Sequence, residues 1–102
     1  MAVREVDIHP LALQELRTAY RWYAERSSTA AHHFRLAVVD AVQRIMTAAE
    51  QGSPFRQRYR WMRVHRFPYL VYYEMRDPQP VLIYAVAHAR RRPGYWLPRT
   101  HS

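Results

Sequence analysis

The apolar residues of this chain change their spacing at Gly52-Ser53-Pro54, and this change limits the folds that the chain can adopt. Before this point the apolar residues repeat with helical spacing, in steps of four, three, four and three: Phe34, Val38, Ala41, Ile45 and Ala48. After it they alternate with a period of two, as in a β-strand that is buried on one face. A single change of period, with no repeat or linker, predicts one α+β domain.

The first half of the chain predicts a short strand and two helices. Residues 3–8 favour a strand that ends at His9-Pro10, and proline suits a first helical turn because its missing N–H needs no partner there. Helical spacing then extends to about Arg26. Ser27-Ser28-Thr29 interrupts the pattern and offers a hydroxyl N-cap for the second helix. Because this break is short, we expect an antiparallel helical hairpin. The apolar stripe of the first helix consists of Leu13, Leu16, Tyr20 and Tyr23.

The second half predicts three consecutive antiparallel strands, at residues 59–65, 69–76 and 81–89. Asp77-Pro78-Gln79-Pro80 is expected to form the turn between the last two. The predicted order is therefore β-α-α-β-β-β, with the helical hairpin packed on one face of a small, mainly antiparallel sheet that the N-terminal strand joins. We expect a single domain over residues 1–102, with about 97–102 as a flexible tail.

Positive charge and aromatic rings are concentrated in the second half. Residues 51–102 contain ten of the sixteen arginines against two acids, which accounts for the net charge of +8, and they contain ten of the fourteen aromatic residues. Nucleic acid and an acidic protein both suit such a surface. The absence of cysteine excludes disulfides and thiolate chemistry. No apolar signal core or membrane-spanning run is present, which predicts a cytoplasmic protein.

Residues 81–99, VLIYAVAHARRRPGYWLPR, combine a predicted strand with a histidine, arginines and rings. Alternation places His88 on one strand face with Tyr84 and Val86. Its imidazole could transfer a proton near neutral pH, or its ring nitrogens could fix the turn that follows, and the residues leave both roles open. Trp96 is expected to fold back and anchor the tail on the sheet, since an exposed indole gains nothing in water.

Two motifs in this half carry a family resemblance. Arg-Phe-Pro-Tyr at residues 66–69 and the ending His-x-x-Arg-x-Pro-x-Tyr-Trp at residues 88–96 resemble the RelE/ParE toxin superfamily. HPLALQEL at residues 9–16 and the pair Trp22-Tyr23 agree, so the likeness covers roughly residues 3–99. Members of this superfamily are the toxins of bacterial toxin–antitoxin pairs, and one branch cleaves mRNA on the ribosome while another poisons DNA gyrase. The resemblance implies a growth-arresting toxin with a cognate antitoxin, which can form a hetero-oligomer with it, and leaves the branch open.

The resemblance also implies roles for particular residues. In a ribosome-dependent endoribonuclease, His88 would transfer a proton, Arg91 would hold the phosphate and Tyr95 would stack on a base or donate to an oxyanion. Apart from the resemblance, Arg63 or Arg66 could line a groove beside His88, because neighbouring strands lie about 5 Å apart. The cations expected to contact nucleic acid or another target are Arg63, Arg66, Arg90, Arg92 and Arg99, although solvated surface charge is the simpler interpretation of Arg90 and Arg92. In a gyrase inhibitor the same basic strand and tail would contact the protein target without catalysis.

A plain RNA-binding or antitoxin-binding module without toxicity is the remaining alternative. We expect no cofactor. We also expect no metal, because His32 and His33 are adjacent on a helix and point about 100° apart, and no acidic cluster accompanies them. Glu74, one of two acids in the basic half, could serve as a base, but a cross-strand ion pair with an arginine explains it more simply.

Overall fold

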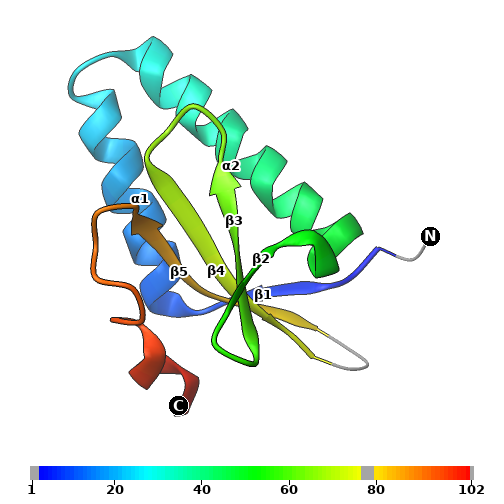
Figure 1. Cartoon of the computed structure of the whole chain (residues 1–102). Helices are drawn as coiled ribbons and strands as arrows, with labels where there is room; N and C mark the ends of the chain where they lie inside the picture. The colour runs from blue at the N-terminus through cyan, green and yellow to red at the C-terminus, as the bar shows by residue number, and fades with distance from the viewer. Residues whose placement is uncertain (1–2, 77–79, 102) are drawn as a thin grey trace.

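Two helices lie against one face of a five-stranded sheet (Figure 1) in the computed structural model, which describes residues 3–76 and 80–101. The helices are α1 (Pro10–Ala24) and α2 (Ser28–Ala48). The strands are β1 (Val6–Ile8), β2 (Ser53–Phe55), β3 (Tyr59–Val64), β4 (Tyr69–Met75) and β5 (Val81–His88), and two 3-10 turns are η1 (Ala49–Gln51) and η2 (Leu97–His101). The predicted α+β class and helical hairpin are confirmed.

The strands follow the spatial order β1-β5-β4-β3-β2. β2 to β5 form an antiparallel meander, and β1 joins the sheet parallel to β5. β2 is an addition to the predicted order. Its central residue is Pro54. Proline is confined to edge strands because it cannot donate a ladder hydrogen bond, and β2 lies at an edge of the sheet. From the sequence alone, Pro54 is assigned to the end of the second helix, so this strand is not predicted. The turn expected at residues 77–80 falls largely on residues 77–79, which lie outside the described residues.

Side-chain caps begin both helices. The Nδ1 atom of His9 accepts a hydrogen bond from the backbone N–H of Leu11 at 3.1 Å, and the Oγ atom of Ser27 accepts one from Ala30 at 3.1 Å. The hydroxyl N-cap predicted for the second helix is thereby confirmed. Neither helix in the described part of the chain is long and apolar enough to cross a membrane.

The close of α2 depends on a small residue. The hydroxyl of the buried Tyr73 donates to the backbone carbonyl of Ala49 at 2.5 Å, where η1 continues the helix. A Cβ atom at Gly52 would overlap this hydroxyl. Gly52 is therefore required for close packing between the end of η1 and the sheet. Its position in the sequence suggests only that it ends the helix.

The sheet is covered on both faces. The helix side is filled by apolar residues of both helices and of β3, β4 and β5, among them Phe34, Ile45, Val64, Val71, Tyr73 and Ile83. On the opposite face the C-terminal segment packs on the sheet through Trp96, which is fully buried. The indole lies 5.0–5.7 Å, centroid to centroid, from the rings of Phe55, Tyr59, Tyr72 and Tyr84.

The folded-back position of Trp96 confirms the prediction made for it. Residues 97–101 form η2, which follows directly from the buried indole. Arg99 in this turn contacts β5 and α1. The buried ring of Trp96 and the polar contacts of Arg99 hold residues 97–101 against the rest of the domain.

A β-bulge in β5 changes the direction of one side chain. Tyr72 of β4 pairs with Ala85 and the next residue of β4 pairs with residue 83, so Tyr84 has no opposite partner. Tyr84 and Ala85 consequently both pack on the face covered by the C-terminal segment. The predicted sharing of one face by Tyr84 and His88 is wrong, because one extra residue reverses the alternation.

Candidate functional site

A cleft of about 600 Å³ opens between α1, the turn that follows β3 and the end of β5. Leu11 and Trp22 of α1 form an exposed apolar wall, and Tyr69 of β4 contributes another ring. His88 and Arg91 also line this cleft. Arg99 lines it as well, so the structure brings three residues of the predicted C-terminal site to one cavity that has an aromatic wall.

His88 serves the turn that follows β5. Its Nδ1 atom accepts a hydrogen bond from the backbone N–H of Arg90 at 3.1 Å, and its ring meets Tyr69 edge-on at a centroid distance of 5.3 Å. A ring nitrogen that accepts a hydrogen bond has no proton, so the neutral imidazole has its proton on Nε2. His88 thus caps the turn, one of the two roles its position suggested, while its ring still borders the cleft.

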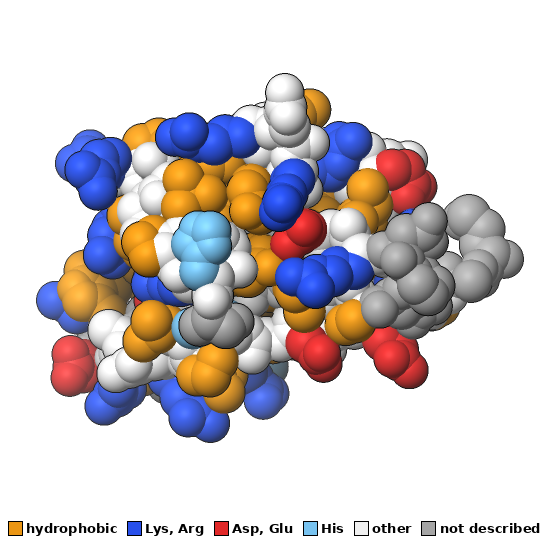
Figure 2. Space-filling view, turned by 90° about the horizontal axis from the view of Figure 1, so that it is seen from below, with side chains coloured by type: hydrophobic (Ala, Val, Ile, Leu, Met, Phe, Trp, Pro, Cys, Tyr) orange, Lys and Arg blue, Asp and Glu red, His pale blue; other side chains and the backbone are white. Residues whose placement is uncertain are grey.

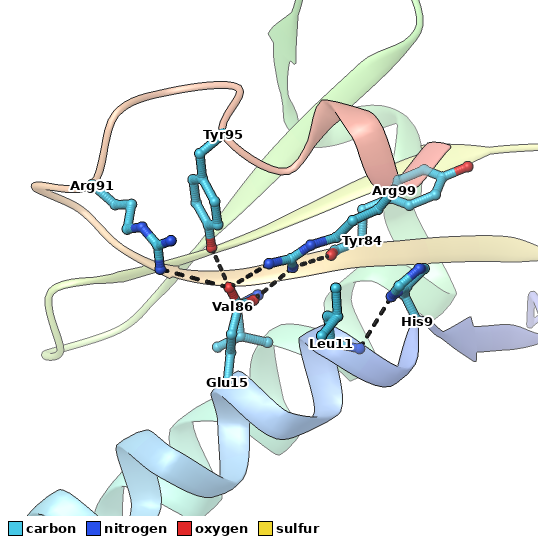
Figure 3. A network of polar contacts seen from close by, with 8 residues as sticks. All are labelled: His9, Leu11, Glu15, Tyr84, Val86, Arg91, Tyr95 and Arg99. Atoms are coloured by element: carbon cyan, nitrogen blue, oxygen red, sulfur yellow. Dashed lines mark hydrogen bonds and ion pairs between the residues drawn. The ribbon is translucent and has the colours of Figure 1, made fainter. Parts of the chain in front are cut away.

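Glu15 of α1 gathers the residues of the C-terminal segment (Figure 3). Its carboxylate accepts hydrogen bonds from the guanidinium of Arg99 at 2.9 and 3.0 Å, and from the hydroxyl of Tyr95 at 2.6 Å. It also accepts a hydrogen bond from the backbone N–H of Val86 at 3.1 Å, and the guanidinium of Arg91 lies 3.9 Å from the carboxylate. One carboxylate thereby joins the first helix, the last strand and the terminal turn.

This network completes an edge of the sheet that β1 leaves open. β1 pairs with β5 only as far as residue 83, and backbone groups beyond that point need other partners. Arg99 donates to the carbonyl of Tyr84 at 2.8 Å, while Glu15 accepts from the N–H of Val86. The side chains of Glu15 and Arg99 are 17% and 13% exposed, so the ion pair is largely shielded from water.

Three predicted site residues, Tyr95, Arg99 and Arg91, contact Glu15 in this network. Burial, reinforced by the hydrogen bond to Glu15, raises the pKa of Tyr95 well above its ordinary value, and its hydroxyl is directed at that carboxylate. The hydrogen bond to Glu15 likewise raises the pKa of Arg99. Arg91 places its guanidinium 3.8 Å from the centre of the Tyr95 ring and remains exposed. Of these three residues, Arg91 is the one with a solvent-facing cation.

Arg63 lies apart from the cleft. Val64 pairs with Tyr69, and Tyr69 pairs with His88, so these three side chains share the face that the helices cover. Arg63 precedes Val64 and must project from the other face, since successive residues of a strand alternate. The expectation that Arg63 borders a groove with His88 is therefore wrong.

The remaining predicted cations occupy turns. Arg66 is exposed in the turn between β3 and β4, with a φ of 71°. Arg90 and Arg92 are exposed in the turn after β5. Glu74 accepts a hydrogen bond from the hydroxyl of Tyr84 at 2.8 Å and lies 3.8 Å from Arg76, which directly follows β4. Within residues 3–76 and 80–101, no three acidic or histidine side chains gather as a metal site.

Glu15 is the central residue that sequence reasoning missed. The predicted stripe of the first helix contained Leu13 and Leu16, whereas the fully buried positions of α1 are Ala12 and Ala19. Glu15 lies three residues after Ala12 and four before Ala19, so it shares their face. The placement of Glu15 between Ala12 and Ala19, at helical spacing, could have predicted that its carboxylate is directed toward the sheet.

Alkaline pH is expected to weaken the fold through its buried phenols. Burial raises the pKa values of Tyr73 and Tyr95 above the ordinary value of about 10. The unfolded chain then loses these protons first as pH rises, so it binds fewer protons than the folded chain, and the free energy of unfolding falls above about pH 10. Urea melts at pH 8 and pH 11 measure this loss. Tyr95→Phe should reduce this loss of stability, and Tyr20→Phe, at an exposed position, should not. An undiminished loss in Tyr95→Phe would contradict the role of the buried Tyr95 hydroxyl in it.

Comparison with known proteins places this fold in a family. A family model described as the ParE toxin of the type II toxin-antitoxin system parDE matches residues 6–93. The matched range extends from β1 to the turn after β5 and includes Glu15, His88 and Arg91. A search of curated proteins returns no match. Because the family model covers most of the length, this chain belongs to the ParE toxin family of type II toxin–antitoxin systems, within the RelE/ParE superfamily.

Proposed function

We propose that this toxin arrests growth by binding and inhibiting DNA gyrase, and that a cognate antitoxin neutralises it. Family membership supports the toxin role and implies an antitoxin partner. The observation that favours gyrase over mRNA is the engagement of Tyr95, whose hydroxyl donates to Glu15 at 2.6 Å. Because the Tyr95 hydroxyl already donates its proton to the Glu15 carboxylate, it does not donate to the oxyanion of a phosphate that is being cleaved.

The other groups expected of a nuclease are dispersed. Cleavage by a 2′-hydroxyl requires a proton-transfer group and cations around one phosphate. Arg99 borders the cleft, but its guanidinium is paired with Glu15, and Arg63 lies on the opposite face of the sheet from His88. Only His88 and Arg91 of the predicted catalytic set remain at the cleft, which supports a binding role better than a catalytic one.

We infer that the exposed arginines after β5 contact the target. The turn that presents Arg90 and Arg92 is held by the hydrogen bond from the Arg91 N–H to the His88 carbonyl at 2.9 Å. Neither Arg90 nor Arg92 forms an ion pair within the described ranges. Uncompensated cations on a fixed turn favour association with an acidic protein surface.

One observation favours the nuclease alternative. His88 and Arg91 share their cleft with Trp22 and Tyr69, and aromatic rings can stack on an unpaired base. A base held there would lie near an imidazole and a guanidinium. This alternative therefore defines the competing outcome of the functional experiment.

A gyrase supercoiling assay with the purified chain tests the proposal. Inhibition is expected, and Arg90→Glu/Arg92→Glu should weaken it by about tenfold or more, because reversed charges oppose association with an acidic surface. The matched control is Arg56→Glu/Arg58→Glu, which makes the same charge change in the exposed turn between β2 and β3. The control should change inhibition by less than about twofold.

The same preparation is added to translating ribosomes, and mRNA 5′ ends are mapped. New ends inside translated codons, lost in a His88→Ala variant of equal thermal stability, would establish a nuclease and contradict the proposal. Intact messages together with gyrase inhibition would support it. Absence of both activities would favour a non-toxic binding module instead.

A further inference from the structure

The turn between β2 and β3 borders a basic hollow at the end of the sheet opposite His88. Strand register places Tyr59, the first residue of β3, and His88, the last residue of β5, at opposite ends of the sheet. The hollow has a volume of about 340 Å³, and its cations are Arg56, Arg58 and Arg60. Figure 2 views the end of the molecule at which this turn lies in Figure 1, and basic side chains are spread over it. None of the three arginines lines the cleft that contains His88.

The positive charge of this hollow is not neutralised within the part of the chain that the structure describes. None of its three arginines forms an ion pair there. Glu74 is the one acid among the described residues that line the hollow. Its carboxylate already accepts a hydrogen bond from the hydroxyl of Tyr84 at 2.8 Å and lies 3.8 Å from Arg76. An anion in the hollow therefore meets guanidinium groups that no carboxylate pairs with.

Two of these arginines are held in place before any ligand binds. The guanidinium of Arg60 donates to the backbone carbonyl of Gly52 at 2.8 Å, and that of Arg56 lies 5.3 Å from the centre of the Phe55 ring. The backbone of Arg56 has a φ of 53°, in the left-handed region that favours glycine. An exposed arginine at such a position lowers stability, and backbone strain of this kind is concentrated at functional sites.

We propose that this turn binds the sugar–phosphate backbone of duplex DNA. A guanidinium pairs with phosphate oxygens through two parallel hydrogen bonds, and such contacts require no particular base. A two-stranded β-ribbon such as the β2–β3 hairpin fits beside or within the major groove of B-form DNA, whereas that of an RNA duplex is too narrow for side chains. The surface proposed for gyrase lies after β5, at the other end of the sheet, so the two sites are independent.

The lining residues argue against other occupants. The ring in the hollow, Tyr59, is only 9% exposed, so it offers no stacking surface for the unpaired bases of a single strand. Pro54 is the one apolar residue among the exposed lining residues. A membrane contact requires exposed apolar side chains, and the centre of a protein interface is depleted of charge.

Fluorescence anisotropy of a labelled DNA duplex of about 20 base pairs tests the proposal with the full chain. Arg56→Gln/Arg58→Gln should weaken binding by about tenfold or more and reduce the slope of log affinity against log salt by about 1–2, because fewer counterions are released. The matched control, Arg17→Gln/Arg21→Gln, removes the same charge from exposed positions on α1 and should weaken binding by less than about threefold. Equal weakening by the two pairs, or no binding by the parent chain, would overturn the proposal.

Two further variants separate binding from folding and from the C-terminal turn. Arg56→Gly relieves the positive φ, so its melting temperature should not fall, while its DNA affinity should fall by about threefold or more. Unchanged affinity would overturn a role for the Arg56 side chain. Arg90→Gln/Arg92→Gln should weaken DNA binding no more than the control pair does. A loss as large as that of Arg56→Gln/Arg58→Gln would assign DNA to the C-terminal turn and overturn the proposal.

Competition identifies the class of polyanion. Unlabelled single-stranded DNA, an RNA duplex and polyglutamate, each at matched total charge, should displace the labelled duplex only at concentrations about tenfold or more above that of unlabelled duplex DNA. Such a difference would support recognition of the DNA duplex. Equal displacement by any of the three would overturn the assignment to duplex DNA.

Discussion

Trp96→Ala is expected to lower the free energy of unfolding by about 3–5 kcal/mol. The indole is fully buried among four rings on the sheet face opposite the helices. Its removal leaves a cavity and detaches the segment that ends in η2. In a domain of this length, such a loss corresponds to a fall in melting temperature of about 12 °C or more. Thermal and urea melts followed by circular dichroism measure both quantities.

Trp22→Ala is the matched control for this prediction. Trp22 is 50% exposed, so its truncation should cost less than half as much. Trp96→Phe should also cost less than Trp96→Ala, because the buried Nε1 atom of the indole has no hydrogen-bond partner among the described residues and phenylalanine removes none. A Trp96→Ala variant within about 1 kcal/mol of the parent would mean that the terminal segment does not stabilise the sheet.

Glu15→Ala is expected to cost about 3 kcal/mol of stability. The substitution leaves the largely buried guanidinium of Arg99 without its carboxylate, and it removes the acceptor of the Tyr95 hydroxyl and of the Val86 N–H. An unpaired buried charge and an unsatisfied backbone donor each destabilise a fold. Urea melts at neutral pH provide the measurement.

Glu25, at the C-terminal end of α1, provides the control for Glu15→Ala. Glu25 is 75% exposed and lies 3.9 Å from Arg26, so Glu25→Ala should change stability by less than about 0.5 kcal/mol. A double-mutant cycle between Glu15→Ala and Arg99→Met should give a coupling energy of about 1 kcal/mol or more. Additive effects in that cycle would refute a direct interaction between the two side chains.

Local patterns in the sequence predict most of this fold. The N-cap at Ser27 and the change of period after Gly52 define the helical hairpin and the start of the strands, because both features act over a few residues. The burial of Trp96 could also be predicted, since a large indole gains free energy only when it leaves water. The motif around His88 and Arg91 indicated the superfamily, which the family match then confirmed.

The remaining features depend on contacts between distant parts of the chain. The bulge at Tyr84 and the opposite orientation of Arg63 follow from strand register, and alternation within a single strand does not specify that register. β2 was missed because Pro54 is rare in strands but tolerated at an edge. The network around Glu15 joins residues that are 71 to 84 positions apart, a separation over which helical spacing gives no information.

Trp96 and Arg99 follow the helices and strands that they contact, and this order determines when the domain can complete its fold. Synthesis proceeds from the N-terminus, and contacts between distant residues form only after both are available. The hairpin and the meander are synthesised before Tyr95, Trp96 and Arg99, so they can form before the C-terminal segment is available. The segment that follows the turn of Arg90 and Arg92 can therefore pack on the sheet only after the strands have been synthesised. A newly made toxin can acquire the contacts that support its proposed target surface only after the rest of this domain has been synthesised.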